Sequence, residues 1–368
     1  MHIIPARNVN EAFVRGMRLL LSTGVVQPSR DGEVITAVMP TVTHYRQPGE
    51  RVLFHPRRRA NPFFHLSEAF WMLAGQNDGT FLDRFVRGFS SRFAEVDGTI
   101  HGAYGHRWRH ALADMDQLDQ IVDVLMKAPN SRQAVLQMWA ADMDLGSVSL
   151  RDRPCNTTIY FRKRERGGSE VLDMTVCCRS NDIIMGAYGA NVVHMSVLQE
   201  YIATQLGLQL GHYWQISNDF HAYARDLSRY GHIIRDGRLL SRSELAEMGE
   251  KEATNWLDPI EVHDLYTRGS GDRYDSPVLA ASPLFSDGKV PLLQELEAWV
   301  MSPEQLPHDE APSVFSELLI PMVRAHTIWK RGDREGALVQ LDAMVGHRDW
   351  WHVAVDWVKN VRPSASES

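Results

Sequence analysis

The amino-acid sequence predicts a chain that mixes β-strands with α-helices and ends in a helical region. β-Rich runs at residues 156–163 and 170–178 stand on either side of a Gly-Gly pair, which predicts a β-hairpin. Apolar residues recur at helical spacing over residues 9–22 and 192–206, and the pattern turns helical from about residue 286. The 368 residues suffice for one large domain with an appendage, or for two domains.

The start of one helix illustrates how the sequence marks its elements. Asn61 supplies an N-cap side chain, Pro62 suits the first helical position, and Gly75 lies just beyond the expected end. The other predicted elements are, in chain order, a helix over 9–22, two strands within 33–54, a helix over 115–127, the hairpin, a helix over 192–206, a strand over 210–217 and a helix pair over 334–345 and 349–360.

The predicted hairpin has a chemical consequence. Its midpoint lies near residue 167, so antiparallel pairing brings Cys155 opposite Arg179 and Ser180. A cation beside a cysteine favours the thiolate, which is the nucleophilic form. A buried structural cysteine is the alternative reading of such a residue, and it suits Cys177 or Cys178 better than Cys155, which follows a proline at a strand start.

Composition narrows the class of protein. The formal net charge of −7 and the pI of about 6.1 are opposite to those of a typical nucleic-acid binder, so we expect no direct nucleic-acid partner. Three cysteines, two of them adjacent, do not form a disulfide framework, and no signal peptide or membrane-spanning run is visible. We therefore expect a cytoplasmic protein. A phosphate loop, H-E-x-x-H and C-x-x-C are all lacking, and the scattered histidines predict no metal site.

Several motifs, taken together in order and spacing, resemble thymidylate synthases and the pyrimidine nucleotide hydroxymethylases related to them. The resemblance runs from about residue 10 to residue 225. The motifs are Ser29-Arg30-Asp31-Gly32, His65-x-x-Glu68-x-x-Trp71, Tyr104-Gly105-x-x-Trp108-Arg109, Ser131-Arg132, Pro154-Cys155, Cys178-Arg179-Ser180-Asn181-Asp182 with Gly186, Asn191, and Asp219-x-His221-x-Tyr223.

The resemblance implies an α+β fold, in which a large mixed sheet with packed helices meets its twin in a homodimer. On this basis we expect a catalytic domain over residues 1–285, a helical extension over 286–360 and a disordered tail over 361–368. In this family a partner subunit supplies two arginines to the phosphate. Arg132 matches one of them, and Gln133 replaces the other.

The resemblance also implies the roles of individual residues. Cys155 would add to C6 of a pyrimidine and make C5 reactive toward a one-carbon unit from 5,10-methylenetetrahydrofolate. Glu68 would act as general acid/base, and its alternative is an ordinary exposed helix glutamate. The remaining implied roles are phosphate binding by Arg30, Arg132, Arg179 and Ser180, reading of the pyrimidine edge by Asn191, binding of the sugar 3′-hydroxyl by His221 and Tyr223, folate binding by Asp182, Gly186 and Glu68, catalysis by Asp182, and removal of the C5 proton by Tyr104.

The loop before Asn191 is one residue longer than the family's loop, and an ungapped comparison places Ala190 at the base-reading position. Asn191 is preferred because the helix after it then keeps its register. An asparagine there suits uracil, whereas cytosine-specific relatives carry an aspartate.

The outcome of the reaction depends on water. Synthases reduce the methylene on C5 inside a dry site, and hydroxymethylases let water add to it. This chain has Ser90 and Phe93 where synthases carry tryptophans, Asn156 where they usually have histidine, and a polar C-terminus. These departures favour hydroxymethylation, and with uracil as the base the expected product is 5-hydroxymethyl-dUMP. A dCMP or CMP hydroxymethylase, a reductive thymidylate synthase, and an inactive nucleotide- or folate-binding relative remain alternatives.

Besides an enzyme and an inactive binding relative, a third possible class is an interaction protein that docks a partner through Trp350, Trp351 and Trp357. At helical spacing such residues more often pack in the core, which is the reading we prefer.

Overall fold

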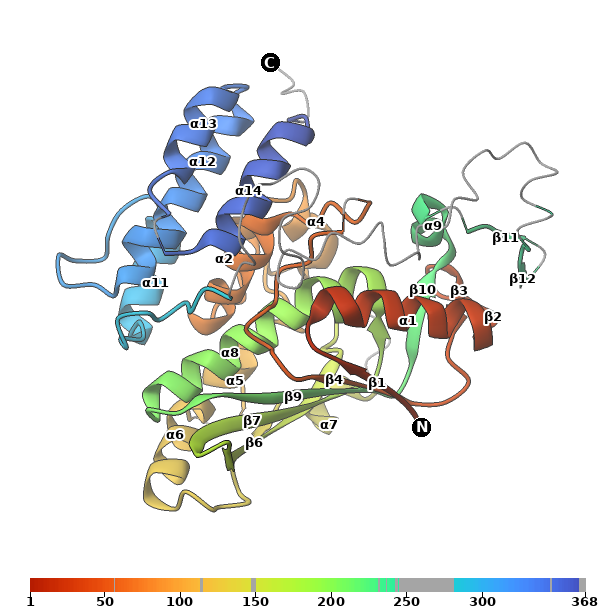
Figure 1. Cartoon of the computed structure of the whole chain (residues 1–368), viewed down its shortest axis with the longest axis horizontal. Coiled ribbons are helices and arrows are strands. Elements are labelled where there is room, and N and C mark those ends of the chain that lie inside the picture. Colours follow the sequence, from red (N-terminus) through yellow and green to blue (C-terminus); the bar gives the residue numbers. More distant parts are fainter. Residues whose placement is uncertain are drawn as a thin grey trace.

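The computed structural model describes residues 1–55, 57–112, 115–146, 150–230, 232–235, 237–241, 244, 281–344 and 346–363. Figure 1 shows a mixed sheet, a layer of helices over one face, and a second helical layer beyond it that is formed by the C-terminal part of the chain. The predicted α+β fold with a large mixed sheet and a C-terminal helical region is confirmed.

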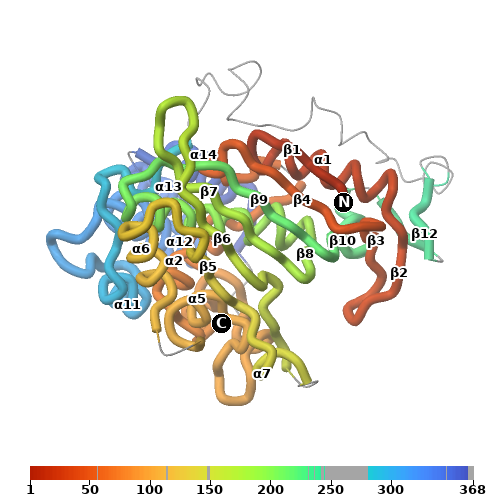
Figure 2. Tube along the Cα trace, turned by 90° about the horizontal axis from the view of Figure 1, so that it is seen from below, coloured from red at the N-terminus to blue at the C-terminus, as the bar shows by residue number. Residues whose placement is uncertain are grey.

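The main sheet has six strands in the order β1-β4-β9-β7-β6-β5, which can be followed in Figure 2, where the molecule is seen from below. The pairs β1–β4 and β7–β9 are parallel, and the other three pairs are antiparallel. The strand bounds are β1 His2–Ala6, β4 Thr41–Tyr45, β5 Val135–Gln137, β6 Asn156–Arg166, β7 Ser169–Cys178 and β9 Gln209–Ser217.

The β6–β7 hairpin closes as predicted. Arg166 pairs with Ser169, and the two glycines between them have φ angles of 59° and 82°, the left-handed conformation that a two-residue hairpin turn requires. A bulge at Thr157 shifts the register by one residue near the open end. The backbone N–H of Arg179 therefore donates to the carbonyl of Cys155 at 2.9 Å, so Arg179, rather than Ser180, is the direct partner of Cys155.

A second sheet has four strands in the order β2-β3-β10-β8 and lies near the open end of the hairpin. Its strands are β2 Val25–Ser29, β3 Gly32–Thr36, β8 Asn181–Asp182 and β10 Phe220–Tyr223. The turn between β2 and β3 holds Arg30. The two strands expected within 33–54 are thus β3 and β4, which belong to different sheets.

Helices α1 (Val9–Thr23) and α8 (Asn191–Gln205) lie over one face of the main sheet, and α2 (Pro62–Leu73) packs on α8 (Figure 1). Oδ1 of Asn61 accepts from the N–H of Phe64 at 3.1 Å, which confirms the predicted N-cap. The other short elements are α3 Thr80–Asp83, α4 Phe89–Phe93, α5 Tyr104–Arg109, α6 Gln117–Lys127, α7 Ala141–Asp144, η1 Ile183–Ala190, α9 Ala224–Leu227, η2 Ser228–Tyr230, β11 Ile234–Arg235 and β12 Arg238–Leu239.

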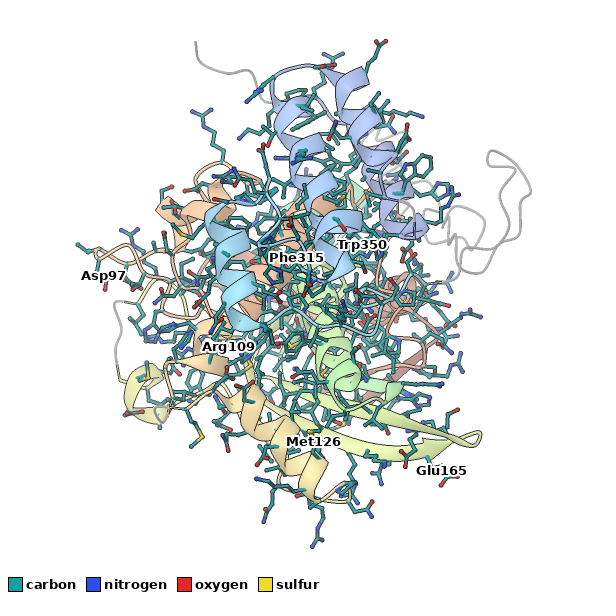
Figure 3. The ribbon with its side chains drawn as sticks, turned by 90° about the vertical axis from the view of Figure 1, so that its left-hand side faces the viewer. Asp97, Arg109, Met126, Glu165, Phe315 and Trp350 are labelled. Atoms are coloured by element: carbon teal, nitrogen blue, oxygen red, sulfur yellow. The ribbon has the colours of Figure 1, made fainter. Side chains whose placement is uncertain are left out.

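The C-terminal helices pack against the side of α2 that faces away from α8. The Phe63 ring meets Trp357 at 5.3 Å between centroids, and Phe70 meets Trp299 at 6.2 Å. Figure 3 shows Phe315 and Trp350 in the interior. These elements are α11 Leu293–Met301, η3 Phe315–Leu319, α12 Ile320–Lys330, α13 Arg334–Leu341 and α14 Arg348–Asn360, of which α13 and α14 form the predicted helix pair.

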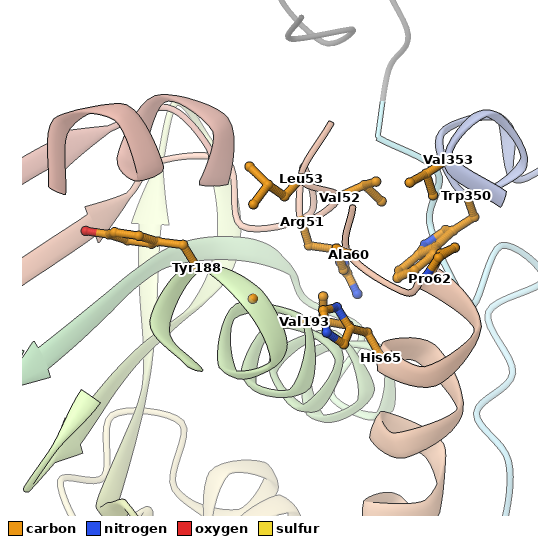
Figure 4. A pocket seen from close by; sticks show the side chains of 11 residues that line it. Arg51, Val52, Leu53, Ala60, Pro62, His65, Tyr188, Val193, Trp350 and Val353 are labelled. Carbon is orange, nitrogen blue, oxygen red and sulfur yellow. The ribbon is translucent and has the colours of Figure 1, made fainter. Parts of the chain in front are cut away.

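The tryptophans of α14 are mainly core residues. Trp350 and Trp357 are buried and Trp351 is half-buried, which confirms the core interpretation for the first two. Figure 4 shows the narrow space where Trp350 and Val353 meet Pro62 and His65 of α2. This space has a volume of about 20 Å³, enough for a single water, so the extension packs closely on the rest of the chain. Residues 364–368 of the expected tail lie outside the described residues.

Candidate active site

The open end of the hairpin borders a polar cavity of about 500 Å³. Strand ends and turns form its walls: the β2–β3 turn, the segment before β6, the end of β7, and β10. We call it the polar cavity. Its lining residues are Gln27, Pro28, Ser29, Arg30, Asp31, Val34, Trp139, Asp144, Leu150, Arg151, Asp152, Arg153, Cys155, Arg179, Ser180, Asp219, His221 and Tyr223.

A smaller cavity of about 180 Å³ adjoins it and is walled mainly by helices and rings. We call it the aromatic cavity. Its lining residues are Glu68, Trp71, Met72, Phe89, Phe93, Ile100, Gly102, Ala103, Tyr104, Asp152, Ala190, Asn191 and His194. Among the described residues, Asp152 alone lines both cavities.

Arg179 is held rigidly beside Cys155. Its Nε donates to the carbonyl of Pro154 at 3.0 Å, and Nη2 donates to the carbonyl of Arg153 at 3.2 Å. Nη2 also lies 3.8 Å from Sγ of Cys155, and the guanidinium stacks 5.6 Å from the centre of the Trp139 ring. The predicted pairing of a cysteine with an arginine is therefore a direct contact.

The expected low pKa of Cys155 is not found in the protein alone. Burial raises the pKa of the thiol and outweighs the lowering by Arg179. The nearby Asp152 carboxylate raises this pKa further, while a hydrogen bond with the Tyr104 hydroxyl lowers it. In the protein alone, burial thus favours the thiol form of Cys155 although Arg179 lies beside it, and all three cysteines are free.

Three of the four candidate phosphate ligands line the polar cavity, and the fourth does not. Arg30, Arg179 and Ser180 line the polar cavity, with Arg30 exposed at the tip of its turn. Arg132 is exposed on the segment before β5 and lines neither cavity of its own chain. Arg153, which the sequence reasoning missed, lines the polar cavity. Its position two residues before the nucleophile was the available signal.

His221 and Tyr223 reach the polar cavity from β10, as an extended segment with two-residue spacing predicts. Nδ1 of His221 lies 3.3 Å from Oδ1 of Asp219. Burial works to lower the pKa of His221, but the contact with the Asp219 carboxylate and the charge of Asp182 together raise it. These two carboxylates therefore stabilise the imidazolium form relative to that of a free histidine.

Glu68 and Tyr104 line the aromatic cavity from α2 and α5. Glu68 is only 8% exposed, so the alternative of an exposed helix glutamate is wrong. Its Oε2 lies 3.0 Å from Nε2 of His194, yet neither atom has a well-aligned hydrogen bond within the described residues. His194 was missed from the sequence, although it follows Asn191 by one helical turn.

The segment before Asn191 is η1, a π-helical segment. The N–H of Asn191 bonds to the carbonyl of Gly186, five residues earlier, and α8 begins at Asn191. Asn191 and Ala190 both line the aromatic cavity. Nδ2 of Asn191 donates to Oδ1 of Asn181 at 3.1 Å, which leaves its carbonyl oxygen toward other partners.

Asp182 and Gly186 line neither cavity within the described chain. Oδ1 of Asp182 accepts from the N–H of Ile184 at 2.9 Å and caps η1, and burial raises the pKa of this carboxyl. A side chain at Gly186 would press on the amides of Asn181 and Asn191. Their positions support the loop that carries Asn191, and their folate contacts remain predictions.

The three departures from synthases occupy different places. Phe93 lines the aromatic cavity. The Ser90 N–H and hydroxyl both bond to Asp83, and Ser90 does not line the cavity. Asn156 is fully buried, accepts from Sγ of Cys178 at 2.9 Å and lines neither cavity, so it does not add to the wetness of the site.

Two features are absent from the residues that the structure describes. No helix there is both long and apolar enough to cross a membrane. No group of three or more histidine, cysteine, aspartate or glutamate side chains in the same residues is placed to hold a metal ion.

Comparison with known proteins places this geometry in a family. A family model described as thymidylate synthase matches residues 11–268. The deoxyuridylate hydroxymethyltransferase of Pseudomonas phage M6 is 37% identical over 366 residues, which cover 98% of this chain and 95% of the relative. The protein of the same description from Bacillus phage SP01 is 33% identical over 204 residues, 53% of this chain and 52% of the relative.

Among solved structures, thermostable thymidylate synthase A from Bacillus subtilis has 21% identity and a TM-score of 0.48, and covers 60% of this chain and 82% of its own. The family model spans well over half of the chain, and the Pseudomonas phage relative spans nearly all of it. The chain therefore belongs to the thymidylate synthase family and is a one-carbon transferase.

Proposed function

We propose that this enzyme transfers a one-carbon unit from 5,10-methylenetetrahydrofolate to C5 of dUMP and that water completes the reaction, giving 5-hydroxymethyl-dUMP. The observation that carries the proposal is the position of Cys155, beside a fixed arginine in the polar cavity that adjoins the aromatic cavity. The Pseudomonas phage relative, which matches along 98% of the chain, supports this substrate and this outcome.

The polar cavity would hold the nucleotide. Arg30, Arg179 and Ser180 would bind its phosphate, with Arg153 as a further cation, because guanidinium forks match phosphate oxygens. His221 and Tyr223 would bind the sugar hydroxyl. Cys155 would then attack C6 as its proton leaves. Tyr104, which bonds to the thiol, would next help to remove the C5 proton.

The aromatic cavity fits the flat ring of a folate. Trp71, Phe89 and Phe93 offer apolar and aromatic surface, and the unsatisfied Oε2 of Glu68 and ring nitrogens of His194 offer hydrogen-bond partners. The bound folate supplies the one-carbon unit. Glu68 would move a proton at the pyrimidine or through a bound water, since it is buried among apolar groups and still reaches the cavity.

Water capture is favoured over reduction because the aromatic wall is incomplete. Ser90 bonds to Asp83 at a place where a synthase has a tryptophan ring, so the cavity lacks that shield. A homodimer is also part of the proposal, because Arg132 is exposed and its own chain's cavities do not use it. Residues 1–285 would be the catalytic domain and 286–360 a supporting extension. The phage relatives suggest the cytoplasm of an infected cell as the place of action.

The test is product mass by LC–MS after incubation of the purified protein with methylenetetrahydrofolate and dUMP, dCMP, UMP or CMP. A hydroxymethyl group on dUMP alone is the expected result. A methyl group with dihydrofolate formed would establish a reductive synthase instead. Hydroxymethylation of a cytosine nucleotide would overturn the base assignment, and no product from any nucleotide would favour a binding role.

A further inference from the structure

The loop that leads into the nucleophile carries an acidic residue with no role in the scheme above. Asp152 stands three residues before Cys155 and contributes to the walls of both cavities. In the last step of the proposed reaction, water adds to the methylene carbon that is bonded to C5. C5 is the neighbour of C6, the ring atom to which Cys155 would be bound. A group shared by the cavity of the thiol and the cavity of Glu68 is therefore placed where that carbon reacts.

The backbone around Asp152 is tied on both sides. The N–H of Arg151 donates to Oε1 of Glu95 at 2.8 Å, and its side chain donates to the carbonyl of Ala94 at 3.0 Å. On the other side, Nε of Arg153 donates to the carbonyl of Asp144 at 3.1 Å. Asp152 thus projects from a fixed segment, as a group with a catalytic role requires.

Gly102 makes room for the carboxylate. A side-chain carbon at this glycine would collide with Oδ2 of Asp152. The Asp152 carboxylate accepts a hydrogen bond from the backbone of Arg153, and the charge of Arg179 acts on it. It in turn acts electrostatically on the Cys155 thiol and the Tyr104 hydroxyl. Burial raises the pKa of Asp152 to about 6. The group is then mostly ionised near neutral pH and is a stronger base than an ordinary aspartate.

We propose that Asp152 is the general base that takes a proton from the water adding to the one-carbon unit on C5. The inference rests on the proposed hydroxymethylation. In this step a bond forms between the water oxygen and the methylene carbon, and the water proton moves to Asp152. The electron pair of the methylene double bond moves toward C4=O. When it returns, C5=C6 forms and the bond from C6 to Cys155 sulfur breaks, so the thiolate leaves.

The experiment follows one turnover of dUMP labelled with tritium at C5, in the presence of methylenetetrahydrofolate. Tritium release reports the steps up to loss of the C5 hydrogen, and LC–MS of 5-hydroxymethyl-dUMP reports water addition. We expect Asp152→Asn to release tritium within about threefold of the wild-type rate and to form product roughly 10²- to 10³-fold more slowly. A covalent adduct of nucleotide and protein then accumulates, detected by intact mass after acid quenching.

Three further measurements separate catalysis from structure. Asp142→Asn, at an exposed position of α7 outside both cavities, should match wild type. Gly102→Ala keeps the carboxylate but displaces it, and should slow product formation more than it slows tritium release. Because the Asp152 charge raises the pKa of Cys155, Asp152→Asn should also speed alkylation of this thiol by iodoacetamide, without any substrate present.

The outcomes separate the role inferred for Asp152 from the hydroxymethylation on which it rests. Wild-type protein that makes thymidylate, or makes nothing, overturns the hydroxymethylase proposal, and the inference falls with it. Wild-type protein that makes 5-hydroxymethyl-dUMP, with an Asp152→Asn variant that loses tritium release and product equally, overturns the inference alone. Product formation at the wild-type rate in that variant also overturns it.

Discussion

The polar cavity and the aromatic cavity meet at Asp152 but are built in different ways. The polar cavity is walled by turns and strand ends and carries four arginines. The aromatic cavity is walled by α2, α4, α5 and the start of α8, and the C-terminal helices pack behind α2. Loops and strand ends present the charged groups and the thiol to a ligand, whereas the packed helices supply a rigid apolar wall. Changes on the two sides should therefore have different consequences.

The largest effect should come from Cys155, the proposed nucleophile, which lines the polar cavity. Cys155→Ser should lower kcat by at least about 10⁴-fold, because a serine hydroxyl beside Arg179 remains protonated and does not add to C6. Tritium release and product formation should disappear together. Cys177→Ser is the matched control, since Cys177 lines neither cavity. Substantial tritium release by Cys155→Ser would show that another group attacks the pyrimidine.

The next largest effect should come from the C-terminal helices, which pack against α2 behind the aromatic cavity. Trp357 is buried against Phe63 of α2, so Trp357→Ala should lower the free energy of unfolding by about 3–5 kcal/mol. Denaturation by urea, followed by fluorescence and circular dichroism, measures the change. Trp351→Ala, at a half-buried position of the same helix, should cost less than half as much. Equal costs would mean that the extension does not stabilise the chain through α2.

Substitutions in the polar cavity should mainly weaken binding of the nucleotide. Arg179→Gln removes a guanidinium that lies beside the thiol and faces the cavity, and should raise the KM for the nucleotide roughly 10- to 100-fold. It should also slow alkylation of Cys155 by iodoacetamide, since Arg179 lowers the pKa of that thiol. Arg348→Gln, on the exposed side of α14, is the control. A variant with unchanged KM and unchanged alkylation would remove Arg179 from both roles.

The sequence predicted the polar cavity better than the aromatic cavity. Arg30, Arg179, Ser180, His221 and Tyr223 all reach the polar cavity, because strand pairing and two-residue alternation fix where such residues point. Of the two residues expected opposite Cys155, Arg179 is its partner, because the bulge at Thr157 shifts the register by one residue.

The groups that sequence reasoning missed depend on tertiary contacts. Asp152 and Arg153 lie on an irregular segment, and hydrogen bonds to residues far away in the sequence place that segment. His194 faces Glu68 because α8 packs against α2, a contact that a sequence does not show. The pKa of Cys155 was also misjudged, because a sequence shows the neighbouring arginine but not the burial that opposes it.

The smallest effect we predict is on the free energy of unfolding. It tests whether the Asp152 carboxylate, which lines both cavities, destabilises the fold when it is charged. Its pKa of about 6 lies above the ordinary value of 3.8, so the folded state binds a proton more tightly than the unfolded state does. Stability is therefore lost as the pH rises from about 4 to 6 and stays lower above it. Asp152→Asn, which carries no charge, avoids this loss.

At pH 8 the Asp152→Asn variant should accordingly be more stable than wild type by about 2 kcal/mol, after allowance for water in the open cavity. Near pH 4.5 the two proteins should differ far less. Urea denaturation of both at each pH measures the difference, in which the contributions of other titrating groups cancel. A variant that is less stable at pH 8 would make Asp152 a structural anchor. A more stable variant that cannot complete the reaction would show that this carboxylate is kept at the junction of the cavities for chemistry, at a cost to the fold.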